Sequence, residues 1–338
     1  MRIGFLGAGR IGAFHAATLA ALDDVGDLVI GDADEARARA LAEAVGARAA
    51  SVDDVFAARP DAVVIATATA SHAELVTRAA RAGLPAYCEK PVATDLAGTI
   101  AALRAVEAAG TLLQVGFQRR FDAGYLAARA AVRAGALGRL HTIRAITSDP
   151  TPPPAAFLPL SGGLIRDCLV HDFDAVRWLT GREVREAYAT GSAGGADLFR
   201  AAGDVDTAAA LLTLDDGTLV TATATRYNGA GYDVRTELAG ERAQLVVGLD
   251  DRTPFASAEP AGPRGPARPW AGFWDRFEPA YRAELATFVR AVRGEVANPC
   301  SGDEALNALL VAEACELSRR EHRPVRLTEI NERVRDVS

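Results

Sequence analysis

The feature that most constrains the fold is a regular alternation of short apolar runs with alanine-rich helical stretches over residues 1–118. The run RIGFLG is apolar and ends at glycine, as buried strands often do, and RIGAFHAATLAAL after it has helical character. The same pair of signals recurs as far as TLLQVGF. Strands separated by helices predict right-handed crossovers and a mostly parallel, doubly wound sheet covered on both faces.

The second part of the chain has a different pattern. From Arg139 onward, short strand candidates follow one another with turn signals such as DDG between them, which predicts a large, mainly antiparallel sheet. Two helices, at 279–294 and 301–320, are expected to close the chain. The 338 residues exceed what one hydrophobic core normally serves. We therefore predict an α/β domain of residues 1–118 and an α+β domain of residues 119–338.

Composition and charge exclude several classes of protein. Acidic residues outnumber Lys and Arg by 44 to 37, so the chain offers no broad basic surface for nucleic acid or for an anionic membrane. No apolar run is long enough to span a bilayer, and glycine-rich sequence begins too early for a signal peptide. The four cysteines are scattered and typical of reduced thiols. We expect a cytoplasmic protein that binds neither nucleic acid nor membranes.

Gly7, Gly9 and Gly12 form a G-x-G-x-x-G turn between the first strand and its helix. The first glycine permits the turn, the second lets a pyrophosphate approach the backbone, and the third allows close helix packing. Arg10 and Ile11 lie within this turn, where helix N–H groups face the phosphates. The pattern predicts a Rossmann domain that binds a dinucleotide.

Asp32 ends the second strand, where a carboxylate can accept hydrogen bonds from the ribose hydroxyls of adenosine. The same charge repels a 2′-phosphate, so NAD is favoured over NADP. Two alternatives stay open. In the first, Asp32 is only a loop or capping residue. In the second, the side chain of Arg10 or Arg37 turns toward the ribose and admits NADP.

Two later segments supply candidates for the nicotinamide end of the cofactor. Thr67 and His72, in ATATASH, could line it, although Ser71 and His72 are equally typical of a helix N-cap and its first turn. Glu89 and Lys90, in CEKP, directly follow a strand and are placed to face the cofactor. The alternative for Lys90 is a surface cation paired with Glu89.

Asp167 and His171 are four residues apart in the segment SGGLIRDCLVHDFDAVRWLTG. On a helix they would share a face, and a carboxylate orients a nearby imidazole and stabilises its protonated form, as a general base for alcohol oxidation requires. The alternative is a capping aspartate and a core histidine. A zinc site that includes Cys168 lacks a third ligand at useful spacing, so we expect no metal.

Five segments of the chain are distinctive when taken together: GFLGAGRIGAFH, CEKP, VGFQRRFD, SDPTPPPAAFLPLSGGLIRDCLVHDFDAVRWL and GYDVRTELAG. They resemble the Gfo/Idh/MocA oxidoreductase family, and within it the inositol 2-dehydrogenases. The resemblance covers nearly the whole chain and implies a tetrameric, NAD-dependent enzyme that oxidises a cyclic polyol, with myo-inositol to 2-keto-myo-inositol as the leading reaction. Another inositol isomer or sugar as substrate, and a non-catalytic NAD-binding sensor, stay open.

The resemblance also implies roles for particular residues. Lys90, Asp167 and His171 form the catalytic group, in which His171 takes the hydroxyl proton and Lys90 bonds the reacting oxygen. Ala68 and Gln118 depart from the family's usual pattern, and could alter the rigidity of the nicotinamide loop and the substrate preference. The residues expected to contact substrate are Lys90, Arg119, Asp149, Asp167, His171 and Tyr232, of which Asp149 is a weaker candidate, as is Asp172.

Overall fold

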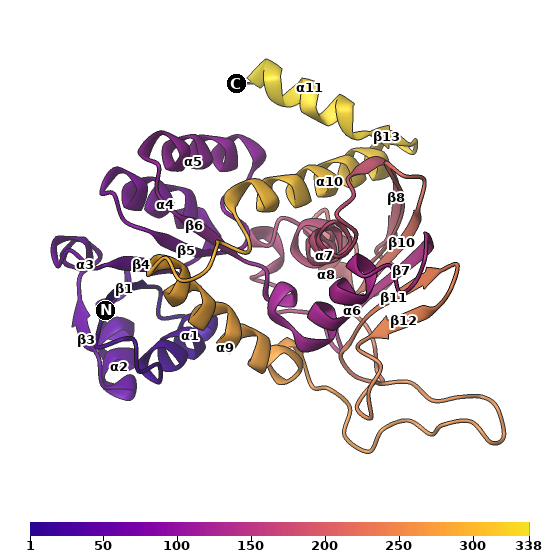
Figure 1. Cartoon of the computed structure of the whole chain (residues 1–338), viewed down its shortest axis with the longest axis horizontal. Coiled ribbons are helices and arrows are strands. Elements are labelled where there is room, and N and C mark those ends of the chain that lie inside the picture. The colour runs from indigo at the N-terminus through magenta and orange to yellow at the C-terminus, as the bar shows by residue number, and fades with distance from the viewer. Residues whose placement is uncertain (338) are drawn as a thin grey trace. The chain divides into compact units, whose positions relative to one another are not determined.

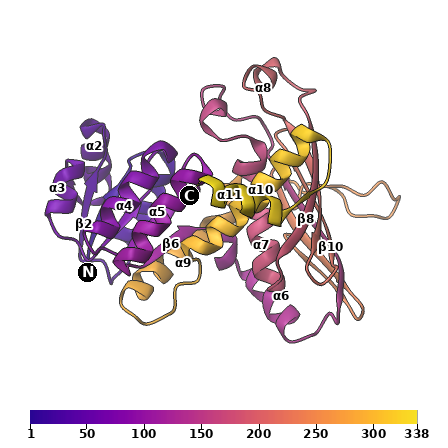
Figure 2. The ribbon, with the colours of Figure 1, turned by 90° about the horizontal axis from the view of Figure 1, so that it is seen from above.

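The computed structural model describes residues 1–337 and divides the chain into two compact units. Figures 1 and 2 show the elements of both. The first unit contains Met1–Phe121 and Pro279–Leu306, and the second contains Asp122–Glu278 and the residues from Asn307 onward.

A six-stranded parallel sheet forms the centre of the first unit, in the order β3-β2-β1-β4-β5-β6. This is the strand order of a Rossmann fold, and the predicted doubly wound sheet is confirmed. The strands are β1 (Arg2–Leu6), β2 (Asp27–Gly31), β3 (Arg48–Ala50), β4 (Ala62–Ile65), β5 (Ala86–Glu89) and β6 (Leu113–Gly116). The helices are α1 (Arg10–Ala20), α2 (Glu35–Val45), α3 (Val52–Ala57), α4 (His72–Arg81), α5 (Leu96–Ala109) and the C-terminal part of α9 (Phe273–Val292), with short 3-10 helices η1 (Thr69–Ser71) and η2 (Gln118–Phe121).

Local sequence explains where several of these helices begin and end. The Asp34 carboxylate accepts hydrogen bonds from two N–H groups in the first turn of α2, and Gly46 ends that helix in the left-handed conformation. Asp95 and Gly110 have the same two roles in α5. These caps satisfy backbone groups that a helix end otherwise leaves without a partner.

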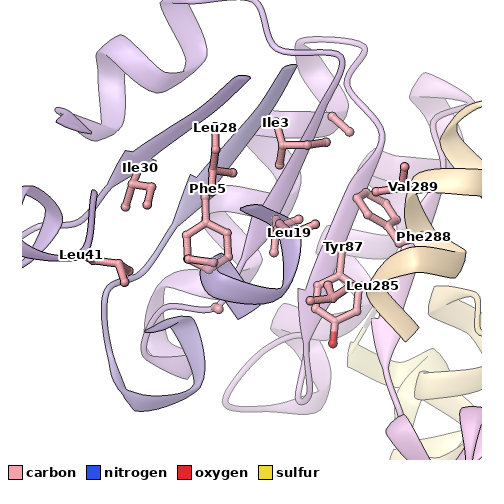
Figure 3. Close-up of a cluster of buried hydrophobic side chains, with 14 of the residues drawn as sticks. Ile3, Phe5, Leu19, Leu28, Ile30, Leu41, Tyr87, Leu285, Phe288 and Val289 are labelled. Carbon is pink, nitrogen blue, oxygen red and sulfur yellow. The ribbon is translucent and has the colours of Figure 1, made fainter. Parts of the chain in front are cut away.

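The core of the first unit lies between one face of its sheet and helices α1, α2 and α9 (Figure 3). Tyr87 of β5 meets Leu285 and Phe288 of α9 on this face. Because α9 fills this core, residues 279–306 belong to the first unit. The domain boundaries predicted from the sequence placed these residues in the second domain, 119–338. The change from alternating strands and helices to consecutive strands marks where the second sheet begins, but it does not show against which sheet a later helix packs.

The second unit contains a seven-stranded sheet in the order β12-β11-β7-β10-β9-β8-β13. Neighbouring strands are antiparallel except β7 and β10, so the sheet is mainly antiparallel, as predicted. The strands are β7 (Leu140–Ser148), β8 (Val184–Ser192), β9 (Thr207–Leu214), β10 (Leu219–Thr225), β11 (Asp233–Gly240), β12 (Gln244–Val247) and β13 (Val325–Arg326). The other elements are α6 (Ala123–Arg133), η3 (Leu158–Leu160), η4 (Ile165–Leu169), α7 (Val170–Thr180), α8 (Asp197–Ala201), α10 (Gly302–Glu321) and α11 (Leu327–Val337).

Burial alternates along β8, β9 and β10, which shows that one face of this sheet is packed and the other is exposed. Helices α6 and α7 lie on the packed side in Figure 2. Ala210 and Leu212 of β9 point to the packed side, whereas Leu211 between them points outward. The exposed side of the sheet therefore carries apolar side chains such as that of Leu211.

Two expectations about the end of the chain were incomplete. The helix expected from residue 279 begins at Phe273 and continues through Pro279, with Phe277 fully buried in its first half. After α10, the chain adds strand β13 on the edge of the second sheet and then α11. Within residues 1–337, no helix combines the length and the low polarity needed to cross a membrane.

Candidate active site

The glycine turn after β1 is shaped by contacts that leave no room for side chains. Gly7 has φ of +110°, and a Cβ there would lie 2.4 Å from the carbonyl oxygen of Ala66. A Cβ on Gly12 would lie 2.0 Å from the Gly7 carbonyl oxygen. Gly9 differs, because nothing lies within 4 Å of the place its Cβ would take. The turn is therefore closed on the protein side and open at Gly9.

The residues around this turn fit a dinucleotide. Helix α1 begins after Gly9 without a side-chain cap, so its first N–H groups are available to phosphate oxygens. The Asp32 carboxylate accepts hydrogen bonds from the N–H groups of Ala8 (2.6 Å) and Asp34 (2.8 Å), which fix its position. A carboxylate has further lone pairs, so Asp32 can still accept hydrogen bonds from ribose hydroxyls.

The segment after β4 is tied to the segment after β5. His72 is buried, with Nδ1 2.7 Å from the carbonyl oxygen of Pro91 and Nε2 3.1 Å from that of Thr67. Ser71 stands at the N-cap position of α4 and His72 in its first turn, as the alternative expected, but the Ser71 hydroxyl bonds the Thr67 hydroxyl at 2.7 Å and no N–H group of the helix. His72 thus holds two loops together, while Thr67 is half-buried.

Lys90 follows β5 directly, is half-buried and precedes Pro91 through a cis peptide bond. Because β2, β1, β4 and β5 are neighbours, their carboxyl ends bring Asp32, Gly7, Thr67 and Lys90 to one edge of the sheet. In doubly wound sheets this edge binds ligands at the point where strand order reverses, which here is between β1 and β4. The first unit therefore gathers the expected cofactor residues and Lys90.

The second unit gathers another group of expected residues at one end of its sheet. Ser148 of β7 pairs with Thr225 of β10 and with Asp233 of β11. Asp149, Arg226 and Tyr232 each adjoin one of these three residues in the chain, so they lie at the ends of adjacent strands. The parallel pairing of β7 with β10 produces this arrangement, and the sequence alone does not show it.

Arg226 is a residue that sequence reasoning missed. Its guanidinium donates one hydrogen bond to Asp149 Oδ2 at 2.8 Å and another to Asp167 Oδ2 at 2.6 Å. The Arg226 side chain is only 4% exposed. Burial acts to lower the pKa of Arg226, but the negative charge around it, including that of Asp167 and Asp149, outweighs burial and raises the pKa. Arg226 therefore stays charged and fixes both carboxylates.

Asp167 lies in the π-helical turn η4, and His171 lies in the first turn of α7. The expected helix is present, but a π turn is wider than an α turn, so the i, i+4 geometry of an α-helix does not describe this pair. Single π turns inside helices often mark functional sites. The Asp172 carboxylate, by contrast, is fully buried and accepts a hydrogen bond from Thr147 at 2.8 Å, which favours a structural role.

Two further expected residues are buried. Arg119 lies in η2 of the first unit, and Tyr232 precedes β11 of the second, with its N–H bonded to the carbonyl oxygen of Trp270 at 2.8 Å. No group of three or more His, Cys, Asp or Glu side chains within the described residues could hold a metal ion.

One sequence signal was overlooked. Lys90 is the single lysine of the chain, since arginine supplies the rest of the 37 basic residues. Arginine stays charged in proteins, whereas lysine can gain and lose its proton. A lone lysine among so many arginines marks position 90 as a candidate site residue. Arg226 offered no comparable signal, because its partners lie 59 and 77 residues away in the chain.

Comparison with known proteins agrees with this picture. Residues 1–117 match the oxidoreductase family model with an NAD-binding Rossmann fold, and residues 125–246 match the GFO/IDH/MocA C-terminal domain. The myo-inositol dehydrogenase of Streptomyces leeuwenhoekii is 42% identical over 320 residues, which are 93% of this chain and 96% of that protein.

Solved structures are similar over the same extent. The crystal structure of a myo-inositol dehydrogenase from Corynebacterium glutamicum has 34% identity and a TM-score of 0.88, covering 97% of this chain and 98% of that one. That of scyllo-inositol dehydrogenase from Lactobacillus casei, with bound NAD(H) and scyllo-inositol, has 26% identity and a TM-score of 0.87, covering 97% and 99%. The resemblance seen in the sequence is confirmed. With the glycine turn and the two sheets, these matches show that the chain belongs to the Gfo/Idh/MocA family of oxidoreductases and is similar to inositol 2-dehydrogenases.

Proposed function

We propose that this oxidoreductase oxidises one carbinol of a cyclic polyol with NAD, and that myo-inositol, giving 2-keto-myo-inositol, is its substrate. The observation that carries the proposal is the place of Lys90, directly after β5 and at the sheet edge that also carries the glycine turn and Asp32. The names of the relatives, which are myo- and scyllo-inositol dehydrogenases, support the choice of substrate.

The proposal assigns three catalytic residues. His171 accepts the hydroxyl proton of the carbinol, and Asp167, held by Arg226, orients and charge-stabilises His171. The Lys90 ammonium donates a hydrogen bond to the reacting oxygen and stabilises the negative charge that develops there. NAD, when bound, supplies the acceptor for the carbinol hydride.

The proposed substrate is uncharged, so its recognition depends on hydrogen bonds to hydroxyl groups. Arg119, Asp149 and Tyr232 are proposed to make them. Asp149 supports this assignment because Arg226 fixes its carboxylate directly after the end of β7. Sites built to hydrogen-bond hydroxyls discriminate strongly, because a wrong isomer leaves polar groups without partners.

We propose NAD rather than NADP as the cofactor. The Asp32 carboxylate is held in place by two backbone N–H groups, and a 2′-phosphate beside it would meet an uncompensated negative charge. Gly9, with open space at its Cβ position, Arg10 and Ile11 at the start of α1 would bind the pyrophosphate.

We also propose that the working form is an assembly of identical chains, with four copies suggested by the family resemblance, in the cytoplasm. Tyr188, Leu211 and Leu219 are exposed on β8, β9 and β10, and Tyr188 pairs directly with Leu211. A second copy would cover this apolar face. The four cysteines are free thiols, which supports a cytoplasmic location.

The test of substrate and cofactor is NADH formation with a panel of inositol isomers and common aldoses, run with NAD and NADP in parallel. We expect the highest kcat/KM with myo-inositol and NAD. A higher kcat/KM with another polyol would reassign the substrate. Tight NAD binding with no turnover on any of these compounds would favour a sensor.

The test of the catalytic group is substitution of its members. We expect Lys90→Ala and His171→Ala each to lower kcat by about 10³-fold, while the Kd for NAD changes by less than about threefold, because neither side chain is needed to hold the dinucleotide. His141→Ala, which removes an exposed imidazole from β7, serves as the control. Near-normal turnover in either of the first two variants would remove the proposed mechanism.

A further inference from the structure

A buried polar cluster lies directly beside Lys90. His15 Nε2 is 2.5 Å from Glu89 Oε1, and the Tyr87 hydroxyl is 2.9 Å from the same oxygen. The Tyr87 hydroxyl is also 3.0 Å from Glu284 Oε2 of α9. All four side chains are buried. Tyr87 lies next to Leu285 in Figure 3, so the polar cluster directly adjoins the apolar core of the first unit.

The number of protons in this cluster is set by its geometry. A tyrosine hydroxyl has one proton, so it can donate to only one of two carboxylates. Both contacts are hydrogen bonds only if one carboxyl group carries a proton itself. Burial raises the pKa of Tyr87 well above its ordinary value, so its hydroxyl stays protonated. Glu89 also receives the hydrogen bond from His15, so it is the carboxylate that two donors face.

The neighbouring strand is shaped to hold this carboxylate. Glu89 pairs with Gly116 of β6, and a Cβ on Gly116 would lie 2.6 Å from the Tyr87 hydroxyl and 3.1 Å from Glu89 Oε2. Any other residue at position 116 would displace both groups. The backbone on the far side of Lys90 is fixed as well, because His72 bonds the Pro91 carbonyl oxygen. Lys90 thus stands between two anchored residues.

We propose that Glu89 is a positioning residue for Lys90: its buried carboxylate, held by His15 and Tyr87, anchors the backbone next to the single lysine and places a negative charge near its ammonium. Burial acts to raise the pKa of Glu89, but hydrogen bonds from His15 and Tyr87 and the positive charge of Lys90 outweigh it and leave the pKa below its ordinary value. The groups hydrogen-bonded to Glu89 are His15 from α1 and Tyr87 from β5. Glu284 of α9 contacts Tyr87 in turn, and Lys90 follows Glu89 in the chain.

This assignment changes how the CEKP segment is understood. The sequence suggested that Glu89 contacts the cofactor, and in the structure its carboxylate bonds His15 of α1 and Tyr87 of β5. The inference rests on the proposed function only where it concerns turnover. The influence of Glu89 on Lys90 is a property of the first unit and can be measured without substrate.

The direct test uses the single lysine as a probe. Protein labelled with ¹³Cε-lysine gives one lysine resonance, whose chemical shift follows the protonation of Lys90. In E89Q we expect the midpoint of this titration to move to lower pH by about one unit, because a nearby anion no longer favours the ammonium. In D27N, which makes the same change from carboxylate to amide at the opposite edge of the sheet, we expect the midpoint to stay in place.

Equal movement in E89Q and D27N, or no movement in E89Q, would overturn the proposal. Glu89→Met provides a second measurement if E89Q does not fold. It removes the same negative charge with a side chain of similar length, so we expect a movement in the same direction. An unchanged midpoint in that variant would also count against the proposal.

The effect on turnover is measured separately. We expect E89Q to lower kcat by about 10- to 100-fold, to leave the KM for NAD within about threefold, and to move the alkaline limb of the kcat profile to lower pH. Asp27→Asn removes an ion-paired carboxylate at the opposite edge of the same sheet and should change none of these. If Lys90→Ala keeps its activity, the proposed function fails while the NMR result still decides the role of Glu89.

Discussion

Arg226 is the residue with the greatest consequence for the second unit. Its guanidinium is shared by Asp149 and Asp167, which come from different segments and which the proposed function assigns to substrate and to catalysis. The two carboxylates are partly buried, with side-chain exposures of 21% and 16%. Without Arg226, both would keep their negative charge in a poorly solvated place, which is costly.

We predict that Arg226→Met lowers the free energy of unfolding by about 3 kcal/mol, because it leaves two partly buried carboxylates without their cation. We also expect a fall in kcat, since Asp167 loses the contact that fixes it. Urea denaturation and steady-state kinetics measure the two effects. Arg144→Met removes an exposed arginine paired with Glu237 and should change neither. Equal stability of both variants would contradict the prediction.

At the residue scale, the sequence predicts the site residues that directly follow strands, but it does not predict the hydrogen-bond partners that hold such residues in place. Gly7, Asp32 and Lys90 are recognisable because each directly follows an apolar run. The bond from Arg226 to Asp167 and the bond from His15 to Glu89 join residues 59 and 74 positions apart. Such pairs depend on strand order and helix packing, which no local pattern contains.

The glycine turn and helix α1 act as one element at the edge of the first sheet. Gly7 and Gly12 are required by the fold, because side chains there would collide with the backbone of Ala66 and of Gly7. Gly9 has an ordinary φ of −77° and open space beside it, so the fold itself does not require a glycine at that position.

We predict that Gly9→Ala leaves the stability of the protein without ligand unchanged and raises the Kd for NAD by at least about tenfold, because the methyl group would occupy space that the pyrophosphate needs. Gly26→Ala, at another glycine with open space beside it, should leave both unchanged. Calorimetric titration with NAD and thermal unfolding are the measurements. Unaltered NAD affinity in Gly9→Ala would place the dinucleotide elsewhere.

At the element scale, the sequence predicts most strands of both sheets and fails where packing decides. The two sheets were predictable because a strand buried on both faces is apolar throughout, as in the parallel sheet. A strand buried on one face alternates between apolar and polar residues, as in the antiparallel sheet. The start of α9 was missed because Pro279 is typical of a helix beginning, although the helix passes through it. The π turn at Ile165–Leu169 was missed because it differs from an α-helix only in hydrogen-bond spacing.

The exposed outer face of the second sheet is the feature that matters most at the scale of the whole molecule. Leu211 is 47% exposed and lies between Tyr188 of β8 and Thr221 of β10 in the strand register. An apolar sheet face of this kind is stable in water when another surface covers it. A second copy of the chain would bury these side chains against their own equivalents.

We predict that Leu211→Arg lowers the molar mass in solution, measured by light scattering after size-exclusion chromatography, because a charge at the centre of the face opposes its burial. Leu126→Arg is the matched control, since Leu126 on α6 is also 47% exposed but lies outside this face. An unchanged mass for Leu211→Arg, or a monomeric wild-type protein, would count against assembly through the sheet.

Residues 279–306 return the chain to the first unit, and this limits how the two units can be exchanged between related proteins. A chimera that joins residues 1–121 of this chain to a relative's second half would inherit the relative's version of α9 in its own core. Leu285 and Phe288 would then be replaced by side chains selected against a different sheet. An exchange of substrate specificity between relatives therefore needs three junctions rather than one, near residues 121, 278 and 306.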